Sequence, residues 1–118
     1  MKFKCLSIVK PNGVRIAQQE KTLEVRSWVP DLSPDEDLLI IENEKYLKNE
    51  EDIDPNGKPV ALVKVRKIRE YKKEDIQAAC ATRWDPGYYS WELYDIRPIY
   101  SDQKLLAARS IYELDFDF

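Results

Sequence analysis

The stretch from Lys21 to Trp28 holds the side chains of this sequence with the clearest capacity for chemistry. In an extended strand, every second side chain projects to the same face. One face then carries a hydroxyl, a carboxylate, a guanidinium and an indole, contributed by Thr22, Glu24, Arg26 and Trp28. Because an ordinary half-exposed strand scatters Lys, Thr and Ser over that face, this row predicts a recognition surface.

Arg26 is the strongest candidate for ligand binding, since a guanidinium holds a phosphate or a base edge with two hydrogen bonds. Glu24 is placed to orient Arg26, or alternatively to accept hydrogen bonds from an exocyclic amine, as carboxylates do with cytosine. Lys21 adds a point charge at the mouth of this site. The competing interpretation is an exposed Glu24–Arg26 pair with Lys21 in solvent, which contributes little free energy.

Aromatic side chains near this row and later in the chain are able to stack on nucleic-acid bases. They are Trp28, Tyr88, Tyr89 and Trp91. Core packing is the usual role of such residues in a barrel strand, and we expect it for Trp91, whereas Trp28 at a strand end is expected to be half exposed. Ser90 and Glu92 project to the opposite side from Trp91 and are weaker candidates for the same site.

The residue types that are missing exclude several kinds of chemistry. The chain has no His, which excludes the Ser-His-Asp triad, the Cys-His pair and every zinc site that contains His. Cys5 and Cys80 alone cannot form a four-thiolate zinc site. The three glycines lie too far apart for a Walker loop or a dinucleotide fingerprint. We therefore expect no metal and no cofactor.

These side chains require a scaffold of strands. Apolar and alternating runs predict six strands, within residues 3–9, 21–28, 37–42, 59–68, 88–99 and 105–118. Good helix formers predict short helices over 14–20 and 73–81, and residues 43–58 are expected to form a loop or a loose helical excursion that ends in a turn. This pattern predicts an α+β, mainly β fold, a small mixed β-barrel with helices beside it.

The length of 118 residues and the hydrophobic content of 43% fit a single domain over residues 1–118. The chain has no apolar run of about 18 residues that predicts a membrane span, and the apolar start Met1–Val9 is too short for a signal peptide. Cys5 and Cys80 are expected to be reduced, packed thiols. We therefore expect a cytoplasmic protein without membrane association. The oligomeric state is left open, and a monomer is consistent with the sequence.

The net charge of −3 conceals a segregation along the chain. Residues 1–28 and 55–84 carry net charges of +4 and +5, and residues 29–54 and 85–118 carry −8 and −4. If the basic segments meet, they form a patch for phosphates; otherwise the blocks neutralise one another as surface pairs. The same choice applies to the basic run Lys64, Arg66, Lys67, Arg69, Lys72 and Lys73. The acidic segment 29–54 is either a solvated loop or a docking surface for a basic protein.

The sequence resembles the ASCH domain family, whose members are small PUA-like β-barrels. The resemblance rests on a helix that runs into a Lys-Thr-x-Glu-x-Arg strand (Lys21 to Arg26), a strand near Val60–Val65 and a late Trp-x-Leu strand at Trp91 and Leu93. It implies that Lys21, Thr22, Glu24 and Arg26 line a cleft that binds RNA or a nucleotide-like ligand. Family members usually place a Gly before the Lys-Thr pair, so the turn at Glu20 is expected to differ in backbone conformation.

The same resemblance implies an enzymatic alternative. Some small ASCH proteins are amidohydrolases that remove the acyl group from N4-acylated cytidine with a Lys, a Thr and a Glu. In that case Lys21 and Glu24 are the catalytic candidates, and the further carboxylate is Glu74, Asp85 or Glu92. Glu24 stands where that subgroup has its Thr, and Thr22 should point away from Lys21, so binding ranks above hydrolysis. The identity of the base, and whether RNA or a free nucleoside binds, stay open.

Overall fold

A seven-stranded mixed sheet forms the body of the protein in the computed structural model, which describes residues 1–118. The strands are β1 (Lys2–Val9), β2 (Leu23–Arg26), β3 (Leu38–Asn43), β4 (Ile53–Glu70), β5 (Tyr89–Pro98), β6 (Leu105–Ala108) and β7 (Ile111–Asp115), and the helical segments are α1 (Asn12–Ala17), η1 (Lys73–Asp75) and α2 (Ile76–Ala79). The strand order is β2-β5-β4-β3-β1-β7, and β6 pairs with β4. Only the β1–β3 pair is parallel.

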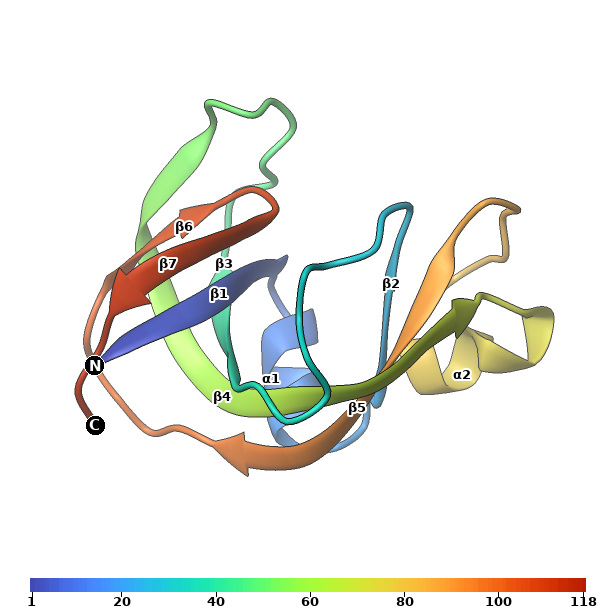
Figure 1. Ribbon diagram of the computed structural model, residues 1–118. Helices are drawn as coiled ribbons and strands as arrows, with labels where there is room; N and C mark the ends of the chain where they lie inside the picture. Colours follow the sequence, from blue (N-terminus) through green and yellow to red (C-terminus); the bar gives the residue numbers. More distant parts are fainter.

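The 18-residue strand β4 organises the sheet, because it pairs with β3, β5 and β6. Its pairing shifts register in each of these ladders, including once opposite Ile40 and Ile41 in β3. Register shifts of this kind bend a strand and increase its twist. Figure 1 shows the result, a long strand β4 that curves along the base of the view, with β1 and β7 on the left and β2 on the right.

The core lies on both faces of β3. Leu38 and Ile40 belong to a buried cluster that contains Trp91, whereas Leu39 and Ile41 belong to a second cluster on the other face. When both faces of a strand are buried, apolar side chains are needed at successive positions, so polar and apolar residues do not alternate along it. This double burial explains why the predicted strand 37–42 is apolar without interruption from Leu38 to Ile41. The burial of Trp91 in the first cluster confirms its expected core position.

Helix α1 is held against β3 by a buried carboxylate. The Val14 N–H donates to Glu42 Oε2 at 2.7 Å, and a carboxylate is favourable at the start of a helix. Gly13 permits this approach, since a Cβ at that position would lie 2.9 Å from the Glu42 Cβ. Ile16 is completely buried on the same helix. Helix α1 is therefore fixed at the position from which the chain enters β2.

The predicted fold class is confirmed: the protein is mainly β, with a curved mixed sheet and short helices. Two details of the prediction are wrong. Residues 105–118 form two strands rather than one, because the chain reverses at Ser110, whose φ is +61°. The predicted loop 43–58 contains the first part of β4, from Ile53 onward. The pairing of that part with β6 is a long-range contact, which local turn residues do not reveal.

The two chain ends meet on one side of the sheet. The Phe116 N–H donates to the Met1 carbonyl at 2.8 Å, and the two termini are drawn close together in Figure 1. None of the helices has the length and apolar character needed to cross a membrane. The acidic and sulfur side chains form no cluster of three or more that could hold a metal ion.

Candidate functional site

An ion pair on the edge strand β2 forms the centre of the candidate site. Glu24 and Arg26 share one face, as the alternation predicted, and Arg26 Nε and Nη2 donate to Glu24 Oε2 at 3.0 and 2.8 Å. Arg26 Nη2 also donates to the Ser7 carbonyl at 3.2 Å. Because three other strands lie between β2 and β1 in the sheet order, this contact joins two strands that do not pair with each other.

Lys21 is buried beside Glu24 rather than placed at the mouth of the site, so its predicted position is wrong. The side chain is only 6% exposed, and Nζ lies 3.2 Å from Glu24 Oε1 and 2.5 Å from the Ala79 carbonyl. The turn before β2 places it there: Gln19 adopts a left-handed conformation with φ of +62°, and the Lys21 N–H donates to the Arg15 carbonyl. The sequence predicted an unusual backbone conformation at Glu20, where family members usually have Gly. The residue with the left-handed conformation is instead its neighbour Gln19.

Both oxygens of Glu24 are occupied by cations. Burial by itself would raise the pKa of this carboxyl, but Arg26 and Lys21 outweigh burial and hold the pKa of Glu24 below its ordinary value. Glu24 is thus an ionised counter-ion inside the protein. Its charge is satisfied by its two neighbours, and its role in the structure is to fix the positions of their side chains.

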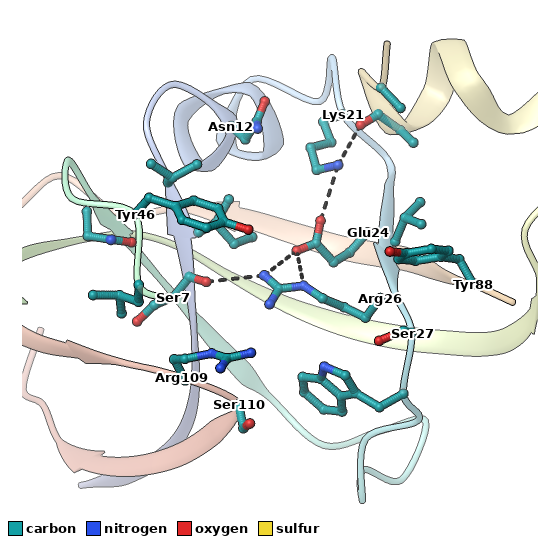
Figure 2. Close-up of a pocket in the computed structure, with 18 of the residues that line it drawn as sticks. Ser7, Asn12, Lys21, Glu24, Arg26, Ser27, Tyr46, Tyr88, Arg109 and Ser110 are labelled. Atoms are coloured by element: carbon teal, nitrogen blue, oxygen red, sulfur yellow. Dashed lines mark hydrogen bonds and ion pairs between the residues drawn. The ribbon is translucent and has the colours of Figure 1, made fainter. Parts of the chain in front are cut away.

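These residues form one wall of a cavity of about 520 Å³. The other walls come from the end of β1, the segment after β3, the C-terminal end of α2 and the turn between β6 and β7. Figure 2 shows dashed contacts from Lys21, which precedes β2, to Glu24 and from Glu24 to Arg26 on that strand, with Ser7 next to Arg26. The volume lies in the range of about 300–1,000 Å³ that is typical of small-molecule sites.

Aromatic residues surround the same cavity. Trp28 lines it and packs edge-on against the buried Trp91, with ring centroids 5.1 Å apart. Trp28 is half-buried, as predicted. Tyr46 and Tyr88 also line the cavity and are 68% and 40% exposed, so their rings are accessible from solvent. Flat rings at the edge of a polar cavity are suited to stacking on planar ligands.

Comparison with known proteins identifies the family. The family model for the ASCH domain matches residues 6–103. The chain belongs to the ASCH family. This assignment confirms the resemblance carried by the Lys-Thr-x-Glu-x-Arg strand, and the matched region contains the strands β2 to β5 completely and the second half of β1.

Solved ASCH structures share this fold at low sequence identity. The crystal structure of ASCH from Zymomonas mobilis matches with a TM-score of 0.62 and 12% identity, covering 91% of this chain and 87% of that one. A tyrosine-to-phenylalanine variant of that protein matches with a TM-score of 0.56 and 14% identity, covering 93% and 91%. No curated protein matches the sequence significantly. These structures show that the fold of this chain is shared with ASCH proteins of known structure.

Three of the site residues predicted from the sequence lie outside the cavity of this ASCH domain. Ser90 is completely buried and donates to Asp75 Oδ2 at 3.2 Å, and Glu92 accepts from Arg69 Nε at 2.7 Å. Arg69 also bonds Asp75, and this hydrogen bond, opposed by burial, lowers the pKa of Asp75 to about 2. The Thr22 N–H donates to the Ala78 carbonyl in α2, and the Thr22 carbonyl accepts from the Leu93 N–H in β5. These residues connect β4, β5, η1 and α2, and their role as ligand contacts stays a prediction.

The basic run of β4 does not face the cavity either. Lys64 and Arg69 are paired with carboxylates, and Arg66 lies over the ring of Tyr94. The charge blocks of the sequence partly neutralise one another through Lys4–Glu36, Lys10–Glu44, Lys64–Asp37 and Arg69–Glu92. These contacts favour the interpretation of the run as a solvated edge.

Sequence reasoning missed Arg109, Tyr46 and Ser7, which line the cavity. Arg109 stands in a turn of the acidic C-terminal segment, far from the β2 motif in the sequence. Long-range pairing of the β6–β7 hairpin with β4 and β1 brings it to the site. No local pattern in the sequence signals that position.

Proposed function

We propose that this ASCH domain binds RNA or a nucleotide in the cavity beside β2. The observation that carries the proposal is the geometry of Arg26. Its Nε and Nη2 are held by Glu24 and Ser7, while Nη1 has no partner within the protein and is not buried. A guanidinium that is fixed on one side and open on the other is suited to a phosphate or to a base edge.

The surroundings of Arg26 support the same ligand class. The cavity has room for about one nucleotide, and Trp28, Tyr46 and Tyr88 provide rings on which a base can stack. Every nucleobase has an aromatic face that can stack on these rings, so the rings support binding of nucleotides but do not select one base. Lys21 and Glu24 support this binding indirectly, because they hold Arg26 in place.

The hydrolase alternative receives less support from the contacts of Lys21. Lys21 Nζ is engaged by the Ala79 carbonyl and by Glu24, and Thr22 does not line the cavity. A lysine that acts as a general base needs a nucleophile or a substrate proton within reach. These contacts suit a structural cation. Binding therefore ranks above hydrolysis of N4-acylated cytidine.

Titration of short single-stranded RNA and of free cytidine derivatives tests the proposal. Arg26→Ala is expected to weaken binding about tenfold or more, because a charge-assisted hydrogen bond contributes roughly 1.5–3 kcal/mol. Arg83→Ala is the matched control, since Arg83 is 80% exposed and lies outside the cavity. Equal affinities for wild type, Arg26→Ala and Arg83→Ala would remove the basis of the site.

Incubation with N4-acetylcytidine, followed by chromatography for free cytidine, separates a binding domain from an enzyme. Turnover that disappears in Lys21→Ala would reverse the ranking.

The proposal also includes a cytoplasmic location. Both cysteines are unpaired thiols, and a reducing compartment suits unpaired thiols.

A further inference from the structure

The cavity carries more positive charge than its single carboxylate can balance. Among its lining residues, Lys21, Arg26 and Arg109 are cationic and Glu24 is the only acid. Both oxygens of Glu24 are taken by Lys21 and Arg26. Arg109 forms no ion pair within the protein. Two positive charges therefore remain uncompensated in a concave site of a chain whose total charge is −3.

Arg109 reaches the cavity from a well-anchored turn. The Ala108 N–H donates to Ser7 Oγ at 3.1 Å, and Ser7 Oγ is also 2.6 Å from the Tyr112 hydroxyl. The guanidinium of Arg109 donates through Nη1 to the Lys48 carbonyl at 2.7 Å. The Ala108 backbone before the turn and the Tyr112 side chain after it are thus both attached to Ser7 of β1, and one end of the Arg109 guanidinium is held.

Ser7 connects the two arginines. Its carbonyl accepts from Arg26 Nη2, while its hydroxyl holds the residue that precedes Arg109. In the view of Figure 2, Glu24 lies above Arg26 and Arg109 lies below it, on the side of the guanidinium away from the carboxylate. The unpartnered Nη1 of Arg26 and the remaining donors of Arg109 therefore serve the same cavity.

We propose that Arg26 and Arg109 clamp the phosphate monoester of a nucleotide. A phosphate monoester carries a charge of about −1.5 to −2 at neutral pH, which matches the excess of three cations over one carboxylate in the cavity, whereas a neutral nucleoside leaves that excess unbalanced. Planar guanidinium groups bind phosphate oxygens with paired hydrogen bonds. The inference rests on the proposed nucleotide site and adds to it that the phosphate is required for tight binding.

The test compares nucleosides with their 5′-monophosphates by calorimetric titration, using all four bases. Wild type is expected to bind at least one monophosphate about tenfold or more tightly than its nucleoside. Arg109→Gln is expected to remove most of this difference, because it should lower monophosphate affinity much more than nucleoside affinity. Arg109→Lys keeps the charge and should retain part of the difference, and Lys104→Gln, an exposed control before β6, should retain all of it.

The phosphate has two sources, a free mononucleotide or the end of an RNA chain. Short RNAs of one sequence with a 5′-phosphate or a 5′-hydroxyl form the second arm. A phosphate-dependent gain in either arm that is lost in Arg109→Gln supports the clamp and identifies the source. Phosphate-independent binding, or an equal loss of nucleoside and nucleotide affinity in Arg109→Gln, overturns the clamp and leaves the proposed site intact. An absence of binding by every nucleoside, nucleotide and RNA overturns both.

Discussion

Arg26 donates two hydrogen bonds to one oxygen of Glu24, and the other oxygen of Glu24 lies 3.2 Å from Lys21 Nζ. The carboxylate thus separates two cations that would otherwise repel each other in a largely buried place. Glu24 is 7% exposed and Lys21 is 6% exposed at the side chain, so water provides little compensation. The geometry of the candidate site depends on this one charge.

Glu24→Gln is expected to lower the free energy of unfolding by about 3 kcal/mol, because it leaves Lys21 buried without a counter-ion. Urea denaturation at pH 7 measures the change. Glu20→Gln is the control, since it removes an exposed carboxylate one residue before Lys21. A loss for Glu24→Gln no larger than that of the control would show that the carboxylate does not stabilise the fold.

Asp75 should make stability fall in acid. Its pKa is lowered to about 2 in the folded protein, against about 3.9 for an unperturbed Asp. A carboxyl with a lowered pKa stabilises the fold fully above the unfolded value and loses that contribution as pH falls toward the folded value. We therefore expect a loss of about 1–2 kcal/mol between pH 4 and pH 2 from this residue.

Urea denaturation of wild type and Asp75→Asn across that pH range checks this expectation. The variant should be less stable than wild type at pH 5 and should lose less stability between pH 4 and pH 2. Glu24, whose pKa is also lowered, contributes in the same direction in both proteins. Parallel pH profiles for the two proteins would exclude Asp75 as a source of the acid sensitivity.

Gly57→Ala is expected to destabilise the barrel by about 1–3 kcal/mol through overpacking. A Cβ at this position would lie 2.6 Å from Ile41 Cγ2 and 2.7 Å from the Leu105 carbonyl oxygen. Thermal denaturation measures the loss. Gly87→Asn is the matched control, because Gly87 faces open space and Asn tolerates its positive φ. Comparable melting temperatures for the two variants would contradict the close packing of β4 against β3 and β6.

The two cysteines should differ in reactivity. Burial raises the pKa of the Cys5 thiol to about 12, so at pH 8 it has almost no thiolate, whereas Cys80 is half-buried and lines the cavity. Iodoacetamide at pH 8 should therefore modify the native protein once, at Cys80. Mass spectrometry of peptides from wild type and Cys80→Ser identifies the modified position.

A ligand in the cavity should slow this modification, because Cys80 belongs to the wall. The rate of Cys80 modification with and without a saturating mononucleotide measures occupancy of the cavity independently of the calorimetric titration. If Cys5 in the Cys80→Ser variant were labelled as fast as Cys80 is in wild type, the burial assigned to Cys5 would be contradicted.

Local features of the sequence predicted the strand elements and the central ion pair. The side-chain period of a strand places Glu24 and Arg26 on one face wherever β2 lies in the fold. The apolar residues 38–41 predicted the strand within 37–42, and the Lys-Thr-x-Glu-x-Arg motif predicted the ASCH family. Each of these inferences needs only residues close together in the chain.

Other parts of the site depend on contacts between distant segments. Lys21 precedes β2, so the period of the strand does not apply to it, and the left-handed turn at Gln19 directs it into the interior. Ser90 and Glu92 contact Asp75 and Arg69 because of the register of β4 and β5 and the position of η1.

Arg109 reaches the cavity only because the β6–β7 hairpin pairs with β4 and β1. The sequence therefore determined which side chains share a strand face, and the tertiary structure decided which faces enclose a cavity and which charges meet there. The physical reason is that side-chain alternation is a property of a few adjacent residues, whereas strand pairing and burial are set by the packing of the whole chain.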